Sequence, residues 1–261
     1  MLIFDLAFEV WDLYCRLYCS SIFIMMDAAK NNKQIIILLG APGSGKGTQA
    51  SLLCEKFNLH YFETSRVLEK SFKSLDADKE IEIEGEMYSP TRERKENWET
   101  GNLCSPPFVT VLVKNKIKEL HQEGKNILFA GSPRTQYEVE RVMPLLEELY
   151  GKQNIKTVVI DVAAEATIFR NTHRRICELM RHSILYSQET EALEHCPIDG
   201  SKLLKRAKLD DPESIKIRIQ EYENRTLPVI DYLEEHGFSV KRVNGEQSVA
   251  EVYRDILKIL E

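Results

Sequence analysis

The stretch that decides the fold runs from residue 34 to residue 48 and reads Gln34-Ile35-Ile36-Ile37-Leu38-Leu39-Gly40-Ala41-Pro42-Gly43-Ser44-Gly45-Lys46-Gly47-Thr48. Its five consecutive apolar residues are typical of a parallel strand that is buried on both faces. The glycines then allow a tight turn, and a helix is expected from about Lys46 onward. Backbone N–H groups gathered at such a turn, and at a helix N-terminus, attract anions.

The residues that end this loop follow the pattern G-x-x-x-x-G-K, with Gly47 where Ser or Thr is usual and Thr48 one place later. Lys46 adds a positive charge that is aimed at the β- and γ-phosphates of a nucleotide. A glycine turn without a ligand is the alternative, but the strand–loop–helix context favours nucleotide binding. The predicted phosphate-binding residues are Gly43, Ser44, Gly45, Lys46, Gly47 and Thr48.

The composition limits the class of protein. The chain has 261 residues, 43% of them hydrophobic, which is enough for one core with inserted subdomains. The net charge of −6 argues against a surface for duplex nucleic acid. Of the six cysteines, only Cys177 and Cys196 have a spacing typical of metal sites. Because proteins with this phosphate-binding loop are normally cytosolic, free thiols or a metal are expected rather than disulfides.

The first 33 residues form an extension of unknown role. Residues 2–26 are rich in apolar residues, but charges interrupt them, so we expect neither a stable membrane span nor a signal peptide. An amphipathic helix that lies on a membrane or a partner is one interpretation. The other is a dispensable extension, with the protein beginning at Met25 or Met26.

A short predicted strand then leads into a helix with a cap at Thr64 or Ser65. Together with the preceding loop, this segment resembles the adenylate kinase family of nucleoside monophosphate kinases. In that family a Ser-Thr-Gly-Asp-x-x-Arg segment holds the monophosphate. Thr64 matches it, but the phosphate-binding arginine of the family falls on Glu69, so that Arg66 or Lys70 would have to compensate.

Gly131-Ser132-Pro133-Arg134-Thr135 follows a second apolar strand and resembles the Gly-Phe-Pro-Arg-Thr turn of the family. The planar fork of Arg134 matches phosphate oxygens, and ligands bind at the carboxyl ends of strands in open α/β sheets. Two positions depart from the family. Ala130 stands where an aspartate organises the Mg²⁺ waters, and Glu138 stands where a glutamine reads the adenine of AMP. The resemblance implies acceptor contacts from Thr64, Gly131 and Arg134.

Three arginines between residues 170 and 175 resemble the entry to the family's lid. Residues at i and i+4 share a helix face, so Arg170 and Arg174 are predicted to point at the same phosphates. Positive charge is needed there because phosphoryl transfer spreads negative charge over the transferring group. Arg218, which follows a predicted Asp211 cap, matches another family arginine. A basic surface helix is the alternative. The resemblance implies a catalytic set of Lys46, Arg134, Arg170, Arg174 and Arg218.

Cys177-x-x-Met180 and Cys196-x-x-Asp199 resemble the zinc-binding lid of the family. A thioether is a poor zinc ligand, so a histidine has to replace Met180. His182 is the favoured candidate and His195 the other. The predicted tetrahedral set is Cys177, His182, Cys196 and Asp199. A metal-free hairpin with two buried thiols stays open as the alternative.

The predicted fold is an α/β, P-loop NTPase-type three-layer parallel sheet with inserted NMP-binding and lid subdomains. The core comprises residues 34–63, 105–169 and 213–261, the NMP-binding insertion residues 64–104 and the lid residues 170–212. The mixed charges of residues 71–100 predict a helical, mobile subdomain, and Pro144 is expected to break the helix that spans residues 138–150.

The resemblance implies an enzyme that moves the γ-phosphoryl group of Mg-ATP to a nucleoside monophosphate, with AMP as the default acceptor. A cytoplasmic monomer that binds no nucleic acid is expected. Two alternatives stay open. Glu69 and Ala130 together are compatible with a nucleotide-binding or regulatory protein that has weak or lost kinase activity. An ATPase, or a kinase for a non-nucleotide acceptor, is the other.

Overall fold

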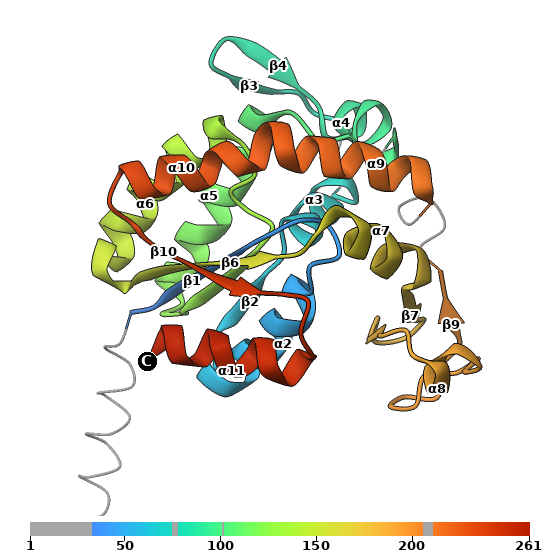
Figure 1. The fold of residues 1–261 in the computed structure, drawn as a ribbon. Helices are drawn as coiled ribbons and strands as arrows, with labels where there is room; N and C mark the ends of the chain where they lie inside the picture. Colours follow the sequence, from blue (N-terminus) through green and yellow to red (C-terminus); the bar gives the residue numbers. More distant parts are fainter. Residues whose placement is uncertain (1–32, 75–77, 101, 206–210) are drawn as a thin grey trace, which may run out of the picture. The chain divides into compact units, whose positions relative to one another are not determined.

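Five parallel strands form the central sheet of the computed structural model, which describes residues 33–74, 78–100, 102–205 and 211–261. The spatial order is β10-β6-β1-β5-β2 (Figure 1). The strands are β1 (Ile35–Leu39), β2 (His60–Phe62), β5 (Ile127–Ala130), β6 (Ile155–Asp161) and β10 (Ser239–Asn244). β1 lies between β5 and β6 and all five of its residues are buried, as its unbroken apolar run predicts.

Helices cover both faces of this sheet, which confirms the predicted three-layer α/β fold (Figure 1). Ile35, Ile37 and Leu39 of β1 belong to the core on one face, and Ile36 and Leu38 to the core on the other. This division follows from the alternation of side chains along a strand. The first face is covered by α5 (Pro106–Gln122), α6 (Gln136–Tyr150) and α10 (Leu227–Glu235), and the second by α2 (Lys46–Phe57) and α11 (Val249–Leu260).

The charged region at residues 71–100, which was predicted to be helical, contains a β-hairpin in addition to helices, and the prediction missed this hairpin. β3 (Ile81–Ile83) pairs antiparallel with β4 (Glu86–Tyr88). Glu84 and Gly85 between them have φ angles of 54° and 85°. Two positive φ angles in a two-residue loop match the twist of paired strands, and a glycine tolerates them easily. The flanking helices are α3 (Thr64–Phe72) and α4 (Pro90–Glu96), followed by a short 3₁₀ turn at Trp98–Thr100.

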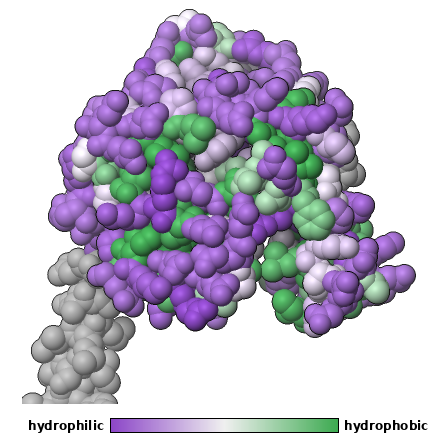
Figure 2. All heavy atoms as spheres, viewed as in Figure 1, coloured by the Kyte–Doolittle hydropathy of each residue, from purple (hydrophilic) through white to green (hydrophobic). Residues whose placement is uncertain are grey.

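A second small sheet, with the order β8-β7-β9, follows α7 (Ala164–His173) (Figure 1). Its antiparallel strands are β7 (Arg175–Cys177), β8 (Ser183–Ile184) and β9 (Leu203–Leu204), and α8 (Gln188–Glu191) lies between the last two. Its buried residues are Cys177, Ile184, Cys196 and Leu203. Six large hydrophobic side chains of this segment are exposed, and Figure 2 shows hydrophobic surface on this part of the molecule. They are Leu179, Met180, Leu185, Tyr186, Ile198 and Leu204.

One helix departs from its predicted form. Pro144 does not break α6, which is continuous from Gln136 to Tyr150 because Val142, Met143 and Leu146 hold both sides of the proline in the core. Near the C-terminus, the π-helical turn η3 (Tyr222–Thr226) joins α9 (Pro212–Glu221) to α10. In Figure 1, α9 and α10 form one nearly continuous rod.

Caps were predicted for two helices, α9 and α3. The side chain of Asp211 accepts hydrogen bonds from the backbone N–H groups of Glu213 and Ser214, which confirms the predicted cap of α9. The cap predicted at Thr64 or Ser65 was wrong, because α3 begins at Thr64 and Glu63 occupies the N-cap. The N-terminal extension lies, up to residue 32, outside the described residues. None of the described helices is both long enough and apolar enough to cross a membrane.

The packing of α10 generates a stability prediction. Leu233 is completely buried in the core that α10 shares with the sheet, and Glu234 beside it is exposed. Leu233→Ala should lower the free energy of unfolding by about 2–5 kcal/mol, because it leaves a cavity in a close-packed core. Glu234→Ala should change it by less than about 0.5 kcal/mol. Urea unfolding measures both, and equal midpoints for the two variants would contradict the packing described here.

Candidate active site

The glycine-rich loop leaves β1 at the carboxyl end of the sheet and enters α2 at Lys46. Gly45, the N-cap of α2, has a left-handed backbone with a φ angle of 94°. Gly43 has a φ angle of 84°, and a Cβ atom there would lie 2.4 Å from the side-chain nitrogen of Asn171. No side chain caps α2, and its first turn has no acidic residue. The first N–H groups of this helix therefore suit an anion.

Lys46 lies folded over this loop. Its ammonium group donates hydrogen bonds to the carbonyl oxygens of Gly40 and Ala41, at 2.6 and 2.8 Å. Burial lowers the pKa of Lys46 to about 7, and the positive charges of Arg134, Arg218 and Arg174 add to this effect. Four basic side chains from separate parts of the chain therefore share one region. Such mutual repulsion is relieved by a multiply charged anion.

Arg134 lies in the turn that follows β5, as predicted. Its guanidinium donates to the carbonyl oxygen of Gly131, and a Cβ atom on Gly131 would lie 2.5 Å from that guanidinium. The hydroxyl of Thr64 also approaches the Gly131 carbonyl, at 3.4 Å. Burial lowers the pKa of Arg134, and the nearby Glu138 opposes this effect. The structure thus brings together the three residues that the resemblance assigned to the acceptor.

Glu138 is buried and is bound to its own turn. Its carboxylate accepts hydrogen bonds from the backbone N–H of Arg134 at 3.1 Å and from the hydroxyl of Thr135 at 3.2 Å. Burial raises the pKa of Glu138, and the Arg134 N–H is the largest opposing influence. Both carboxylate oxygens are therefore used within this turn, and one of them holds the backbone of Arg134 in place. The sequence pattern suggested a position that reads a base and did not reveal this supporting role.

The three remaining arginines occupy different places. Arg170, on α7, donates to the carbonyl oxygen of Gly245 at 2.9 Å. Arg174 is the first residue beyond α7 and has an extended backbone, so the argument that it shares a helix face with Arg170 was wrong. The reason is that Arg175 already pairs with Ile184 in the small sheet, which requires an extended chain. The charges of Arg174 and Arg218 act on Lys46.

A carboxylate also lies at the end of β6, the strand beside β1. Asp161 ends β6, and its side chain pairs with Arg242 at 3.0 Å. This pair is half-exposed. On the acceptor side, Arg66 is exposed and pairs with Glu63. The compensation for Glu69 that was considered for Arg66 therefore has no support in these contacts.

Two residues that the sequence reasoning missed contact the site. Thr226, in the π-helical turn, donates its hydroxyl to the carbonyl oxygen of Arg134 at 3.0 Å. Asn171, which is completely buried, donates to the carbonyl oxygen of Pro42 at 3.0 Å. Neither residue has a local sequence signal, because each contact joins segments that are about 90 or more positions apart.

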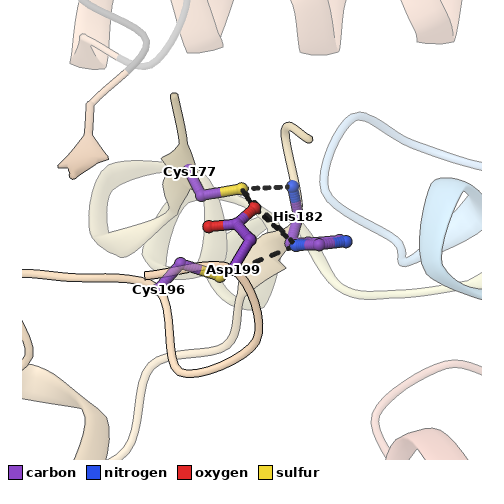
Figure 3. A group of neighbouring side chains, drawn as sticks. All are labelled: Cys177, His182, Cys196 and Asp199. Atoms are coloured by element: carbon purple, nitrogen blue, oxygen red, sulfur yellow. Dashed lines mark hydrogen bonds and ion pairs between the residues drawn. The ribbon is translucent and has the colours of Figure 1, made fainter. Parts of the chain in front are cut away.

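Four potential metal ligands converge in the small sheet (Figure 3). The ligand atoms of Cys177, His182, Cys196 and Asp199 all lie within 4.8 Å of one another. The Nδ1 atom of His182 lies 3.5 Å from the Cys177 sulfur, 3.6 Å from the Cys196 sulfur and 3.2 Å from a carboxylate oxygen of Asp199. Tetrahedral zinc with these ligands places them roughly 3.3–3.8 Å apart. The structure therefore selects His182, whereas His195 and Met180 are exposed.

The surroundings of this cluster support a cation. The second oxygen of Asp199 accepts hydrogen bonds from the N–H and the hydroxyl of Ser201, at 3.0 and 2.7 Å. Hydrogen bonds from Cys177 and Ser201 hold the pKa of Asp199 well below its usual range. Such outer hydrogen bonds orient a metal ligand.

Comparisons with a family model and with known proteins both point to adenylate kinases. The model of the family described as adenylate kinase matches residues 38–238. The chain is similar to an adenylate kinase of Staphylococcus aureus (strain Mu50), with 31% identity over 230 residues, which is 87% of this chain and 98% of the relative. Adenylate kinases of Oceanobacillus iheyensis and Caldicellulosiruptor bescii are each 32% identical, over 87% and 86% of this chain and 98% of each relative. The family predicted from the sequence motifs is thereby confirmed, and the chain belongs to the adenylate kinase family.

Proposed function

We propose that this protein transfers the γ-phosphoryl group of Mg-ATP to a nucleoside monophosphate, with AMP as the expected acceptor. The observation that carries the proposal is the group of four basic side chains around one loop, with the pKa of Lys46 lowered to about 7. Family membership supports the same reaction. Because the transferring group becomes more negative in the transition state, a concentration of fixed positive charge stabilises that state most.

The donor half of the reaction is assigned to the loop between β1 and α2. Residues 43–48 supply backbone N–H groups and the α2 N-terminus to the phosphates of Mg-ATP, which enters as one substrate. Lys46 then exchanges the carbonyl oxygens of Gly40 and Ala41 for the β- and γ-phosphates. Arg170, Arg174 and Arg218 complete the set of charges. Arg170, bound to the Gly245 carbonyl, lies beside the loop that follows β10.

The acceptor half is assigned to Thr64, Gly131 and Arg134. Arg134 supplies the positive charge, since its planar fork matches the oxygens of a phosphate. Glu138 and Thr226 hold the backbone of Arg134 from two sides, at 3.1 and 3.0 Å. Because Glu69 is acidic, Arg134 carries more of the acceptor phosphate binding than it would beside a second arginine.

The two insertions are proposed to close on the substrates. We assign residues 64–104 to the acceptor and residues 170–212 to a lid over ATP. Closure excludes water and brings the arginines together around the transferring group, so that ATP is not hydrolysed. In-line transfer needs no covalent intermediate on the protein. A cytoplasmic location and a monomeric state stay predictions from the family resemblance.

A coupled assay with ATP and each of AMP, CMP, UMP, GMP and dTMP tests the proposed reaction. We expect nucleoside diphosphate formation, with AMP as the best acceptor. Arg134→Ala should lower kcat/KM for the acceptor by about 100-fold or more, because a charged group aimed at the phosphate is lost. The affinity for ATP should stay nearly unchanged.

Arg141→Ala is the matched control, since Arg141 lies on the same helix as Glu138 but pairs with Glu84 on the surface. It should retain wild-type rates. Activity with none of the five monophosphates would defeat the kinase reaction and favour a nucleotide-binding or regulatory protein. Loss of ATP binding in Arg134→Ala would mean that the donor and acceptor halves are misassigned.

The lowered pKa of Lys46 predicts proton uptake on ATP binding. In the free protein the ammonium group loses its proton near pH 7, and the phosphates of bound ATP raise its pKa. Between these two pKa values the complex holds more protons than the free protein, so affinity falls as pH rises above 7. Calorimetric titration with Mg-ATP at pH 8, in buffers of different ionisation enthalpy, should detect up to about one proton taken up. At pH 6 the uptake should nearly vanish; equal uptake at both pH values would contradict the assignment.

We further propose that the four-ligand cluster binds zinc, supported by the separations of Cys177, His182, Cys196 and Asp199. These four side chains offer two sulfurs, one nitrogen and one oxygen, a set that suits tetrahedral zinc. The metal would act structurally, by joining the segments around β7 and β9. The hydrophobic core of this sheet has only four buried residues, so it has little other means of stabilisation.

Metal analysis tests this proposal. The purified protein should contain close to one equivalent of zinc, and less than about half an equivalent would exclude the site. His182→Ala should reduce the zinc content and the thermal stability of the protein. His195→Ala is the matched control, because His195 is an exposed neighbour outside the cluster, and it should retain the metal. Equal losses in both histidine variants would argue against His182 as a ligand.

A further inference from the structure

Asn171 is a polar side chain buried between α7 and the glycine-rich loop. It is completely inaccessible to solvent. Its amide nitrogen donates one hydrogen bond to the carbonyl oxygen of Thr167, one turn earlier at 2.8 Å, and another to the carbonyl oxygen of Pro42 at 3.0 Å. The second contact bridges 129 positions of the sequence. It joins the helix that leads to the arginines directly to the loop that receives the phosphates.

The orientation of this amide follows from its neighbours. Both groups near the nitrogen are carbonyl oxygens, which accept and never donate hydrogen bonds, so the nitrogen has to face them. The amide oxygen is buried and has no hydrogen-bond partner among the described residues. Burying an unpaired polar atom is costly. An apolar residue of the same size would fill the space without that cost, so packing alone does not account for an asparagine here.

Gly43 is shaped to fit this amide. A Cβ atom on Gly43 would lie 2.4 Å from the amide nitrogen and 3.1 Å from the amide carbon of Asn171. The bare backbone of the loop therefore lies directly against the side chain. The loop and the helix are in close contact here and share the hydrogen bond from Asn171 to Pro42, an arrangement that fixes both their distance and their register.

Asn171 lies between two arginines of the candidate site in the sequence. Arg170 precedes it, and Arg174, whose charge acts on Lys46, follows three residues later at the end of α7. A shift of α7 relative to the loop would move both arginines relative to the phosphate site. The geometry of the donor half therefore depends on the contact between Asn171 and Pro42.

We propose that Asn171 is a positioning residue for phosphoryl transfer: it holds the phosphate-binding loop in register with Arg170 on α7 and Arg174 just beyond it, by donating a hydrogen bond to the Pro42 carbonyl. This inference rests on the proposed kinase reaction. It adds a residue that touches neither substrate and acts through Pro42 and Gly43 on one side and Arg170 and Arg174 on the other.

Asn171→Leu tests the proposal, because leucine keeps the shape of the side chain and removes the donor. We expect the Kd for Mg-ATP to rise about 3- to 10-fold, the effect of one hydrogen bond. We expect kcat to fall about 10- to 100-fold, since small displacements of charged groups weaken transition-state stabilisation strongly. The KM for the nucleoside monophosphate should change less than about twofold, because the acceptor half is held by other contacts. Asn171→Ala provides a second variant in case leucine disturbs folding.

Asn154→Leu is the matched control. Asn154 also donates its amide to the carbonyl oxygen four residues earlier, that of Tyr150 at 2.8 Å, but it lies away from the loop. It should retain wild-type kinetics. A double-mutant cycle then tests whether Asn171 acts through Arg174, because a general loss of stability would not make the effects of the two substitutions on kcat depend on each other. In an Arg174→Ala background, Asn171→Leu should lower kcat much less than in the wild type, because the arginine that it positions is already absent.

Measuring both the Kd for Mg-ATP and kcat separates a failure of this proposal from a failure of the proposed kinase reaction. Calorimetric binding of Mg-ATP needs no turnover, so it tests the contact with Pro42 even if the wild type phosphorylates no monophosphate. A folded Asn171→Leu variant whose ATP affinity and kcat both match the wild type would overturn the proposal. Strictly additive effects of Asn171→Leu and Arg174→Ala on kcat would overturn it as well.

Discussion

Mutual repulsion among basic side chains at one turn of the backbone is the constraint on which the rest of this structure depends. Lys46, Arg134, Arg174 and Arg218 come from four separate segments. Burial lowers the pKa of Lys46 to about 7, and the charges of the three arginines add to this effect. Such an arrangement is unfavourable without an anion, so the fold has to hold it in place. The central position of β1 and the well-packed faces of the sheet supply the rigid support.

The turn around Arg134 shows how that support works at the level of single residues. Glu138 and Thr226 bind the backbone of Arg134, while its guanidinium donates to the carbonyl oxygen of Gly131. Thr226 reaches this position from a π-helical turn, a feature that is frequent at functional sites. In the proposed reaction, binding of the acceptor phosphate therefore depends mainly on Arg134, which is held from several sides, and the acidic Glu69 increases that dependence.

The small sheet after α7 faces a different physical problem. It has four buried residues and exposes several large hydrophobic side chains, so its own core contributes little stability. Two of those four buried residues, Cys177 and Cys196, belong to the cluster with His182 and Asp199 (Figure 3). A metal cross-link would supply the stability that the small hydrophobic core of this sheet does not provide. It would also make the small sheet rigid enough to move as one body.

The sequence by itself determined the features that depend on local chemistry. The apolar run, the glycines and Lys46 predict β1, the loop and α2 correctly, since each property acts within a few residues. The Asp211 cap and the position of Arg134 after β5 were equally predictable. The sequence also favoured His182 over His195, and the structure brings His182 to the other three candidate ligands. Only the tertiary structure decided the extended backbone of Arg174 and the contact between Asn171 and Pro42. Each of these depends on strand pairing or on contacts between distant segments, which exist only once the chain has folded.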